Sequence, residues 1–233
     1  REELESLKEK KLIKSGFFYF DYLKDKIEGS QNDSEILVAP SWNKNRLNFI
    51  NEDFEEILKN LLNSGYKVRF RPHPETIKRS QSLMESYKEK FKHKNFLFDD
   101  NSENLEAMQN AKCLITDNSG ISIEYMMLFK KPVIFYSDFD KVHNENFEMI
   151  KGLVPIEDTI KDKFGYEFHK HELNEVDKVI NKAISSFDKK EIDNFLENNF
   201  YNYGNTIDYF DKNFSKICFW IFINKWTKNL DHL

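Results

Sequence analysis

The chain has 233 residues, which is enough for one large domain or two small ones with a buried core. Its 35 basic and 40 acidic side chains are mixed along the sequence and give a net charge of -5, which excludes the broad positive field of a nucleic-acid-binding protein. The two cysteines lie far apart, and no signal peptide or apolar run of ~20 residues is visible, so we predict a cytoplasmic protein without disulfides.

The first 34 residues predict a connection to another domain. Residues 1–14 are highly charged and carry leucines at helical spacing, which is typical of a solvated helix or a connector. The sequence starts with Arg1 rather than methionine, so we expect a preceding domain that this chain lacks. We therefore interpret residues 1–34 as a connector helix and linker.

From Ile36 onward, short apolar runs alternate with helical patterns. The strand-like runs are 36–42, 66–72, 95–100, 113–118 and 132–138, and the helical patterns between them are 51–65, 77–92, 102–111 and 120–130. Strands that alternate with helices form right-handed βαβ units and a parallel sheet. The sequence therefore predicts an α/β fold class, a Rossmann-like and mostly parallel sheet flanked by helices, over residues 35–205.

Beyond about residue 140 the alternation weakens. Residues 171–187 have helical spacing, and residues 214–226 form an aromatic-rich helical pattern with seven consecutive apolar residues. Residues 206–233 are therefore predicted to form a C-terminal helical tail. This tail could lie in a membrane interface or be buried against a neighbouring domain, and the spread of aromatic residues through the whole chain favours burial.

The segment FRPHPET, residues 70–76, places a histidine between two prolines at the end of a predicted strand. Proline fixes its own φ and keeps the preceding residue out of the helical region, so Arg71 and His73 are expected to be held extended. Ligands of open α/β sheets bind beyond the carboxyl ends of the strands, where these side chains would meet them. In the alternative, the prolines only end the strand and His73 is an ordinary loop residue.

The segment TDNSGI, residues 116–121, leads from a strand into a helix. A helix start has unpaired N–H groups and partial positive charge, so it binds phosphate without a lysine. Ser119 adds a hydroxyl donor, and Gly120 lets a ligand approach the backbone closely. In the alternative interpretation, Asp117, Asn118 or Ser119 only caps the helix.

Three predicted strand ends are expected to face the same crevice. They are Ser41 and Trp42, the RPHP segment and the TDNSG turn. The sequence has no Walker lysine motif, no G-x-G-x-x-G and no G-x-S-x-G, which argues against a P-loop enzyme, a dinucleotide dehydrogenase and a serine hydrolase. It also lacks H-E-x-x-H and C-x-x-C, so we expect neither a protein-bound metal nor another cofactor.

In their order, the segments GFFYFDYL, ILVAPSW, RPHP, LITDNSGISIEY, KPVIFYSD and YNYGNT resemble the carboxyl-terminal nucleotide-binding domain of the CDP-glycerol glycerophosphotransferase family, over roughly residues 12–210. That family builds teichoic acids and related capsule polymers on a GT-B scaffold. The resemblance implies the C-terminal half of a GT-B fold, with His73 and Ser119 on the diphosphate of a CDP-linked donor. Ser41 and Trp42 match the family's strand end near the nucleotide, and we assign Arg71, Asp117, Asn118 and Gly120 to the same donor site.

The turn departs from the family pattern, which usually reads aspartate, aromatic, serine, serine. This chain has Asp117, Asn118, Ser119 and Gly120 there, so one hydroxyl is lost while the backbone N–H donor is kept. Glu124 on the next helix resembles a glutamate that contacts the ribose in sugar-nucleotide GT-B enzymes, including the UDP-N-acetylglucosamine 2-epimerase group. In the alternative interpretation, Glu124 is a solvated helix glutamate.

The resemblance implies an enzyme that transfers glycerol phosphate, or a related polyol phosphate, from a CDP-linked donor to a polymer or lipid-linked acceptor. His73 is the expected catalytic residue, and the general base is expected in the missing domain. We expect the enzyme to be cytoplasmic, with peripheral contact to the inner face of the membrane. We expect no nucleic-acid partner. Two other classes stay open: a GT-B glycosyltransferase or epimerase that uses a sugar nucleotide, and a non-catalytic assembly domain.

Overall fold

The computed structural model describes residues 14–27, 32–42, 49–50, 52–137, 154 and 156–230. The chain forms two compact units, one of residues 27–192 and one that combines residues 1–26 with residues 193–233. The predicted connector helix in residues 1–14 lies almost entirely outside the described residues. The domain boundaries expected from the sequence stay predictions.

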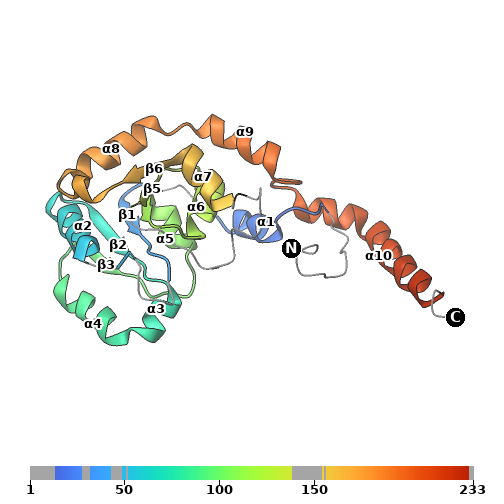
Figure 1. Cartoon of the computed structure of the whole chain (residues 1–233), viewed down its shortest axis with the longest axis horizontal. Coiled ribbons are helices and arrows are strands. Elements are labelled where there is room, and N and C mark those ends of the chain that lie inside the picture. Colours follow the sequence, from blue (N-terminus) through green and yellow to red (C-terminus); the bar gives the residue numbers. More distant parts are fainter. Residues whose placement is uncertain are drawn as a thin grey trace. The chain divides into compact units, whose positions relative to one another are not determined.

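The larger unit contains a six-stranded parallel sheet with the strand order β3-β2-β1-β4-β5-β6 (Figure 1). The strands are β1 (Glu35–Val38), β2 (Lys67–Phe70), β3 (Phe96–Phe98), β4 (Ala111–Thr116), β5 (Val133–Tyr136) and β6 (Gly165–Phe168). From β1 the chain proceeds outward to β2 and β3, and it then returns to pair β4 with the other side of β1. The predicted fold class is confirmed, because this is a Rossmann-like parallel sheet flanked by helices.

The helices of the larger unit cover both faces of the sheet. They are α2 (Glu52–Asn63), α3 (Pro74–Arg79), α4 (Gln81–Lys90), α5 (Leu105–Asn110), α6 (Ile121–Phe129), α7 (Ile156–Phe164), the 3-10 helix η2 (Lys170–Glu175), α8 (Val176–Ser186) and the start of α9 (Lys189–Asn199). Strand side chains alternate between the two faces. Val68 and Phe70 therefore join the core formed with α2, α4 and α8, whereas Arg69 between them lies on the opposite face.

Several elements differ from the sequence prediction, and the expected helix over residues 171–187 is the 3-10 helix η2 followed by α8. The expected helix over residues 77–92 is two helices, because Ser80 leaves helical geometry with φ -134° and ψ 46°. The helices α7 and α9 and the strand β6 were not predicted at all. Strand β6 is an edge strand with only Phe168 fully buried, so it lacks the apolar run that marks a central strand.

The smaller unit contains α1 (Phe18–Asp25), α10 (Thr206–Leu230) and the part of α9 from Asp193 onward. The backbone N–H of Phe17 donates to Thr206 Oγ1 over 3.1 Å, and that of Ile207 donates to Asp21 Oδ2 over 3.1 Å. At each helix start, a backbone N–H thus donates to a side chain of the other helix. Helix α10 covers residues 206–230 of the expected tail 206–233, and no helix in the described ranges reaches the length and apolarity that a bilayer crossing requires.

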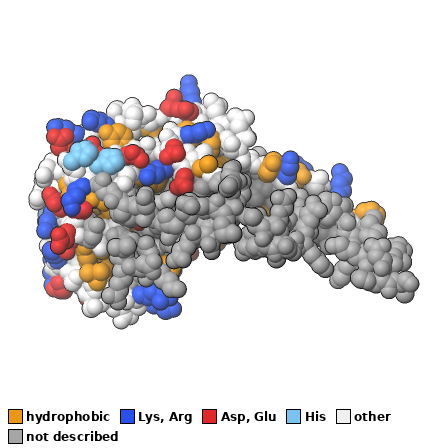
Figure 2. Space-filling view, viewed as in Figure 1, with side chains coloured by type: hydrophobic (Ala, Val, Ile, Leu, Met, Phe, Trp, Pro, Cys, Tyr) orange, Lys and Arg blue, Asp and Glu red, His pale blue; other side chains and the backbone are white. Residues whose placement is uncertain are grey.

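Charged side chains of both signs are interspersed on the face of the molecule shown in Figure 2. This distribution agrees with the mixed charge pattern of the sequence. An anionic ligand would therefore depend on a local arrangement of donors, and the carboxyl edge of the sheet provides the candidates.

Candidate donor-binding site

The point where the strand order reverses lies between β1 and β4, and two predicted site residues meet there. Asp117 follows β4 and Ser41 follows β1. The backbone N–H of Ser41 donates to Asp117 Oδ1 over 2.7 Å, and its hydroxyl donates to Asp117 Oδ2. Both residues are buried, with exposed fractions of 1% for Asp117 and 3% for Ser41. This contact joins the two strand ends at the place where doubly wound sheets bind ligands.

The RPHP segment leaves β2 at the same edge. Arg71 is buried, with Nη1 3.0 Å from Asp99 Oδ2 and with Nη2 donating to the carbonyl oxygen of Asn101 over 2.9 Å. Its guanidinium group is thus engaged with the residues that follow β3. This arrangement favours a role for Arg71 in holding the strand end.

His73 is exposed and occupies the N-cap position of α3. Its Nδ1 accepts a hydrogen bond from the backbone N–H of Glu75 over 3.1 Å, so in the neutral ring the proton is on Nε2. The ring of Trp42 stacks on the imidazole with a centroid separation of 6.4 Å, and the Arg79 guanidinium lies 5.4 Å from the Trp42 ring centroid. The imidazole is therefore held by a cap and by a ring contact.

The turn before α6 does not place a capping side chain at the N-cap position of the helix. Gly120, which has no side chain that could accept a hydrogen bond, occupies the N-cap position. Asn118 donates from Nδ2 to Asp158 Oδ1 over 3.0 Å, and the carbonyl oxygen of Ser119 accepts from the Ser122 hydroxyl over 2.7 Å. None of Asp117, Asn118 and Ser119 occupies the N-cap position of this helix. A side chain built on Gly120 would meet no atom within 4 Å, so open space lies beside the helix start.

Glu124 lies in the first turn of α6 and is half-buried. Its Oε2 accepts a hydrogen bond from Asn104 Nδ2 over 3.0 Å. Burial raises the pKa of Glu124 above its ordinary value, and the Asn104 amide partly opposes this shift. The alternative of a fully solvated helix glutamate is therefore wrong, while the ribose contact stays a prediction.

The raised pKa of Glu124 predicts how stability changes with pH. The folded protein holds this proton more tightly than the unfolded chain, so the stability contribution present at low pH is lost as pH rises from about 4.5 through the folded pKa. We expect Glu124→Gln to raise the melting temperature at pH 7.5, with a gain that shrinks toward pH 4.

The matched control is Glu75→Gln, because the hydrogen bond from Arg79 lowers the pKa of Glu75 and its effect should have the opposite sign. Thermal melts across this pH range measure both variants. A gain from Glu124→Gln that stays constant with pH would contradict the assignment.

Three residues at the carboxyl edge of the sheet were not predicted from the sequence. Asp99, Asn101 and Asn104 lie between β3 and α5 and contact Arg71 or Glu124. The run of acidic and amide residues DDNSEN, which begins within the third predicted strand, was a usable signal. No cluster of His, Cys, Asp and Glu suited to a metal is present in the described part of the chain.

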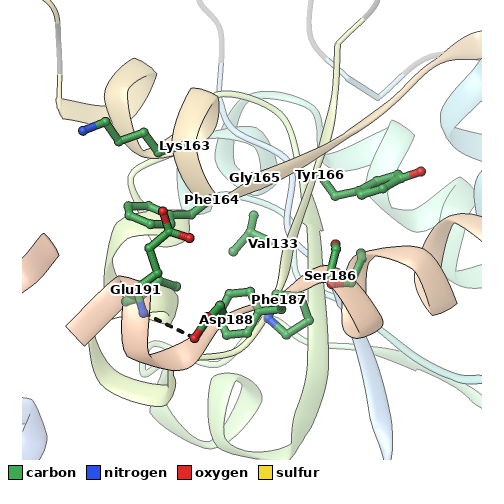
Figure 3. Close-up of a pocket in the computed structure, with 12 residues that line it drawn as sticks. Val133, Lys163, Phe164, Gly165, Tyr166, Ser186, Phe187, Asp188 and Glu191 are labelled. Carbon is green, nitrogen blue, oxygen red and sulfur yellow. Dashed lines mark hydrogen bonds between the residues drawn. The ribbon is translucent and has the colours of Figure 1, made fainter. Parts of the chain in front are cut away.

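Two cavities differ in their position relative to this edge of the sheet. One of about 300 Å³ is lined by Arg69, Asp99 and the start of the β3–α5 connection. The other, of about 210 Å³, is lined by the amino-terminal ends of β5 and β6 and the α8–α9 junction, where Figure 3 shows the backbone of Glu191 hydrogen-bonded to Asp188. The second cavity therefore belongs to the opposite edge of the sheet.

Comparisons with known proteins agree with this architecture. The structure of the wall teichoic acid polymerase TagF matches with a TM-score of 0.50 and 20% identity, over 85% of this chain and 46% of the TagF chain. The UDP-GlcNAc 2-epimerase of Methanocaldococcus jannaschii, solved with UDP-GlcNAc and UDP, matches with a TM-score of 0.51 and 19% identity, over 87% of this chain and 54% of that one. The chain thus spans about half the length of either protein and has the fold of one half of a GT-B enzyme.

No curated protein matches the sequence. The family model of CDP-glycerol:poly(glycerophosphate) glycerophosphotransferase matches residues 8–148, which is more than half of the chain and contains every residue of the candidate site. The chain therefore belongs to the CDP-glycerol:poly(glycerophosphate) glycerophosphotransferase family.

Proposed function

We propose that this chain binds a CDP-linked polyol donor, with CDP-glycerol as the first candidate, and forms the donor side of a glycerophosphotransferase. The observation that carries the proposal is the start of α6, which lacks a side-chain cap, borders open space at Gly120 and lies beside the Ser41–Asp117 contact. Unpaired backbone N–H groups at a helix start stabilise phosphate oxygens. Family membership supplies the chemical class of the ligand.

Each predicted site residue has a role in this proposal, and Glu124 in the first turn of α6 contacts the ribose of the donor nucleotide. The N–H groups at Gly120 and the Ser119 hydroxyl bind the diphosphate, and Nε2 of His73 donates to it from the neighbouring strand end. Trp42 positions His73 by ring stacking, as the geometry supports. Arg71, Ser41, Asp117 and Asn118 act indirectly, since their described contacts hold the strand ends and the turn together.

The reaction needs stabilisation of charge more than covalent work by the protein. An acceptor hydroxyl oxygen attacks the phosphorus that carries glycerol, a new P–O bond forms, and the bond to CMP breaks. Negative charge grows on the departing CMP phosphate, where the α6 start and His73 stabilise it. The general base and the binding site for the polymer or lipid-linked acceptor belong to a domain outside this chain. We place the reaction at the cytoplasmic face of the membrane.

Calorimetric titration of the chain with CDP-glycerol, CDP, CMP, UDP and UDP-GlcNAc tests the proposal. We expect CDP-glycerol and CDP to bind more tightly than CMP, because the diphosphate reaches the α6 start. We also expect the cytidine ligands to bind more tightly than their uridine counterparts. Binding of UDP-GlcNAc alone would favour the glycosyltransferase or epimerase alternative, and no binding at millimolar concentration would favour a non-catalytic assembly domain.

The role of Ser119 gives a separate prediction. Since Ser119 does not cap α6, Ser119→Ala should leave the melting temperature within about 2 °C while it weakens CDP binding about tenfold. Asn118→Ala is the control, because its amide contacts Asp158 and its loss should affect CDP binding less. Loss of stability without loss of affinity in Ser119→Ala would remove Ser119 from the phosphate site.

A further inference from the structure

Asn104 occupies the N-cap position of α5 but does not cap that helix. Asparagine is among the best N-cap residues, and its side-chain oxygen normally accepts a hydrogen bond from the first helical turn. Here the side chain instead crosses to α6 and donates from Nδ2 to Glu124 Oε2 over 3.0 Å. The protein thus forgoes a stabilising cap in favour of a contact with a candidate ligand residue.

Topology brings Asn104 and Glu124 to the same edge of the sheet. Helix α6 begins directly after the carboxyl end of β4, so Glu124 in its first turn lies near that edge. Helix α5 ends where β4 begins, so its own start, with Asn104, lies at the carboxyl edge as well. Both side chains are half-buried, which strengthens the hydrogen bond relative to one exposed to water.

The segment that carries Asn104 is anchored at its other end. Asp99 is buried and its Oδ1 accepts from both the backbone N–H and Nδ2 of Asn101, over 3.2 and 2.9 Å. Arg71 binds this turn through Asp99 and through the carbonyl oxygen of Asn101. The β3–α5 connection is therefore fixed to the RPHP strand end before it reaches Glu124.

We propose that Asn104 is a positioning residue that orients the Glu124 carboxylate toward the ribose hydroxyls of the donor nucleotide. The proposal rests on the proposed function, in which Glu124 contacts the ribose. A carboxylate has about four acceptor positions on two oxygens, so one hydrogen bond to Oε2 fixes its plane and leaves capacity for hydroxyl donors. Pre-orientation of this kind raises affinity by reducing the entropy that binding must remove.

The test compares CDP with 2′,3′-dideoxy-CDP, which lacks both ribose hydroxyls, by calorimetry on the whole 233-residue chain. The wild-type chain should prefer CDP by about tenfold, the equivalent of one good hydrogen bond to a charged group. Asn104→Ala should reduce this preference to about twofold and leave the affinity for dideoxy-CDP unchanged. Asn104→Asp, which has the same shape, should reduce it at least as far because two carboxylates repel each other.

Asn95→Ala is the matched control. It removes an amide that donates to the Gly65 carbonyl oxygen over 3.3 Å near the start of β3, at the opposite edge of the sheet. This variant should keep the wild-type preference. In a Glu124→Gln background, Asn104→Ala should have little further effect, because residues that act through one contact are not additive.

The outcomes distinguish a failure of the ribose contact from a failure of the role of Asn104. If the wild-type chain binds both nucleotides equally, the ribose contact fails and Asn104 fails with it. If the wild-type chain prefers CDP and Glu124→Gln abolishes the preference while Asn104→Ala keeps it, only the role of Asn104 is wrong. Equal weakening of both nucleotides by Asn104→Ala would show a purely structural role and would also overturn the proposal.

Discussion

Replacement of His73 by alanine is expected to lower turnover with CDP-glycerol by about 10²–10³, since a positioned donor to the departing phosphate is worth about that factor. The measurement requires the enzyme with its acceptor-side domain present. The reason is geometric: Nδ1 is engaged by the Glu75 N–H and the ring is stacked on Trp42, so Nε2 is directed by two contacts of the protein itself. Binding of CMP should be affected less than binding of CDP-glycerol.

The cap at α3 complicates His73→Ala, because loss of an N-cap costs about 1 kcal/mol of stability. His73→Asn separates the two roles, since asparagine is an effective N-cap but places no donor where Nε2 lies. We expect His73→Asn to retain the melting temperature and still lose turnover, and His73→Gln to recover part of it. Near-normal turnover in His73→Asn would mean that the RPHP segment only ends a strand and caps the next helix.

Replacement of Asp117 by alanine is expected to lower the free energy of unfolding by about 3 kcal/mol. The backbone N–H and the hydroxyl of Ser41, both buried, would lose their acceptor, and hydrogen bonds to a charged group contribute about 1.5–3 kcal/mol each. Chemical denaturation measures this loss. Affinity for CDP should fall as well, because the ends of β1 and β4 would no longer be joined beside the α6 start.

Two variants serve as controls for Asp117→Ala. Asp117→Asn keeps an oxygen for the Ser41 N–H and should lose about 1 kcal/mol, and Ser41→Ala removes only the hydroxyl contact and should lose a similar amount. A variant Asp117→Ala that keeps its stability but no longer binds CDP would instead make Asp117 a direct ligand contact.

The sequence by itself determined the central elements of the fold. The apolar runs that became β1, β2, β4 and β5 and the amphipathic pattern of α2 are local properties, readable because side chains alternate every two residues in a strand and every 3.6 in a helix. The edge strand β6 was not predicted, because an edge strand needs few apolar side chains. The strand ends that carry Ser41, His73 and Ser119 followed from the same reasoning, since parallel strands end at one edge.

Tertiary structure alone decided what the side chains at that edge contact. Asp117 was assigned to the donor site, with a helix cap as its alternative, and in the structure it binds Ser41, 76 positions earlier in the sequence, because β1 and β4 are neighbours in the sheet. Asn104 is likewise an ideal cap by local rules and instead binds Glu124 on another helix. Local patterns cannot predict such choices, because a polar side chain near several partners takes the one that the packed sheet and helices bring within hydrogen-bond distance and shield from water.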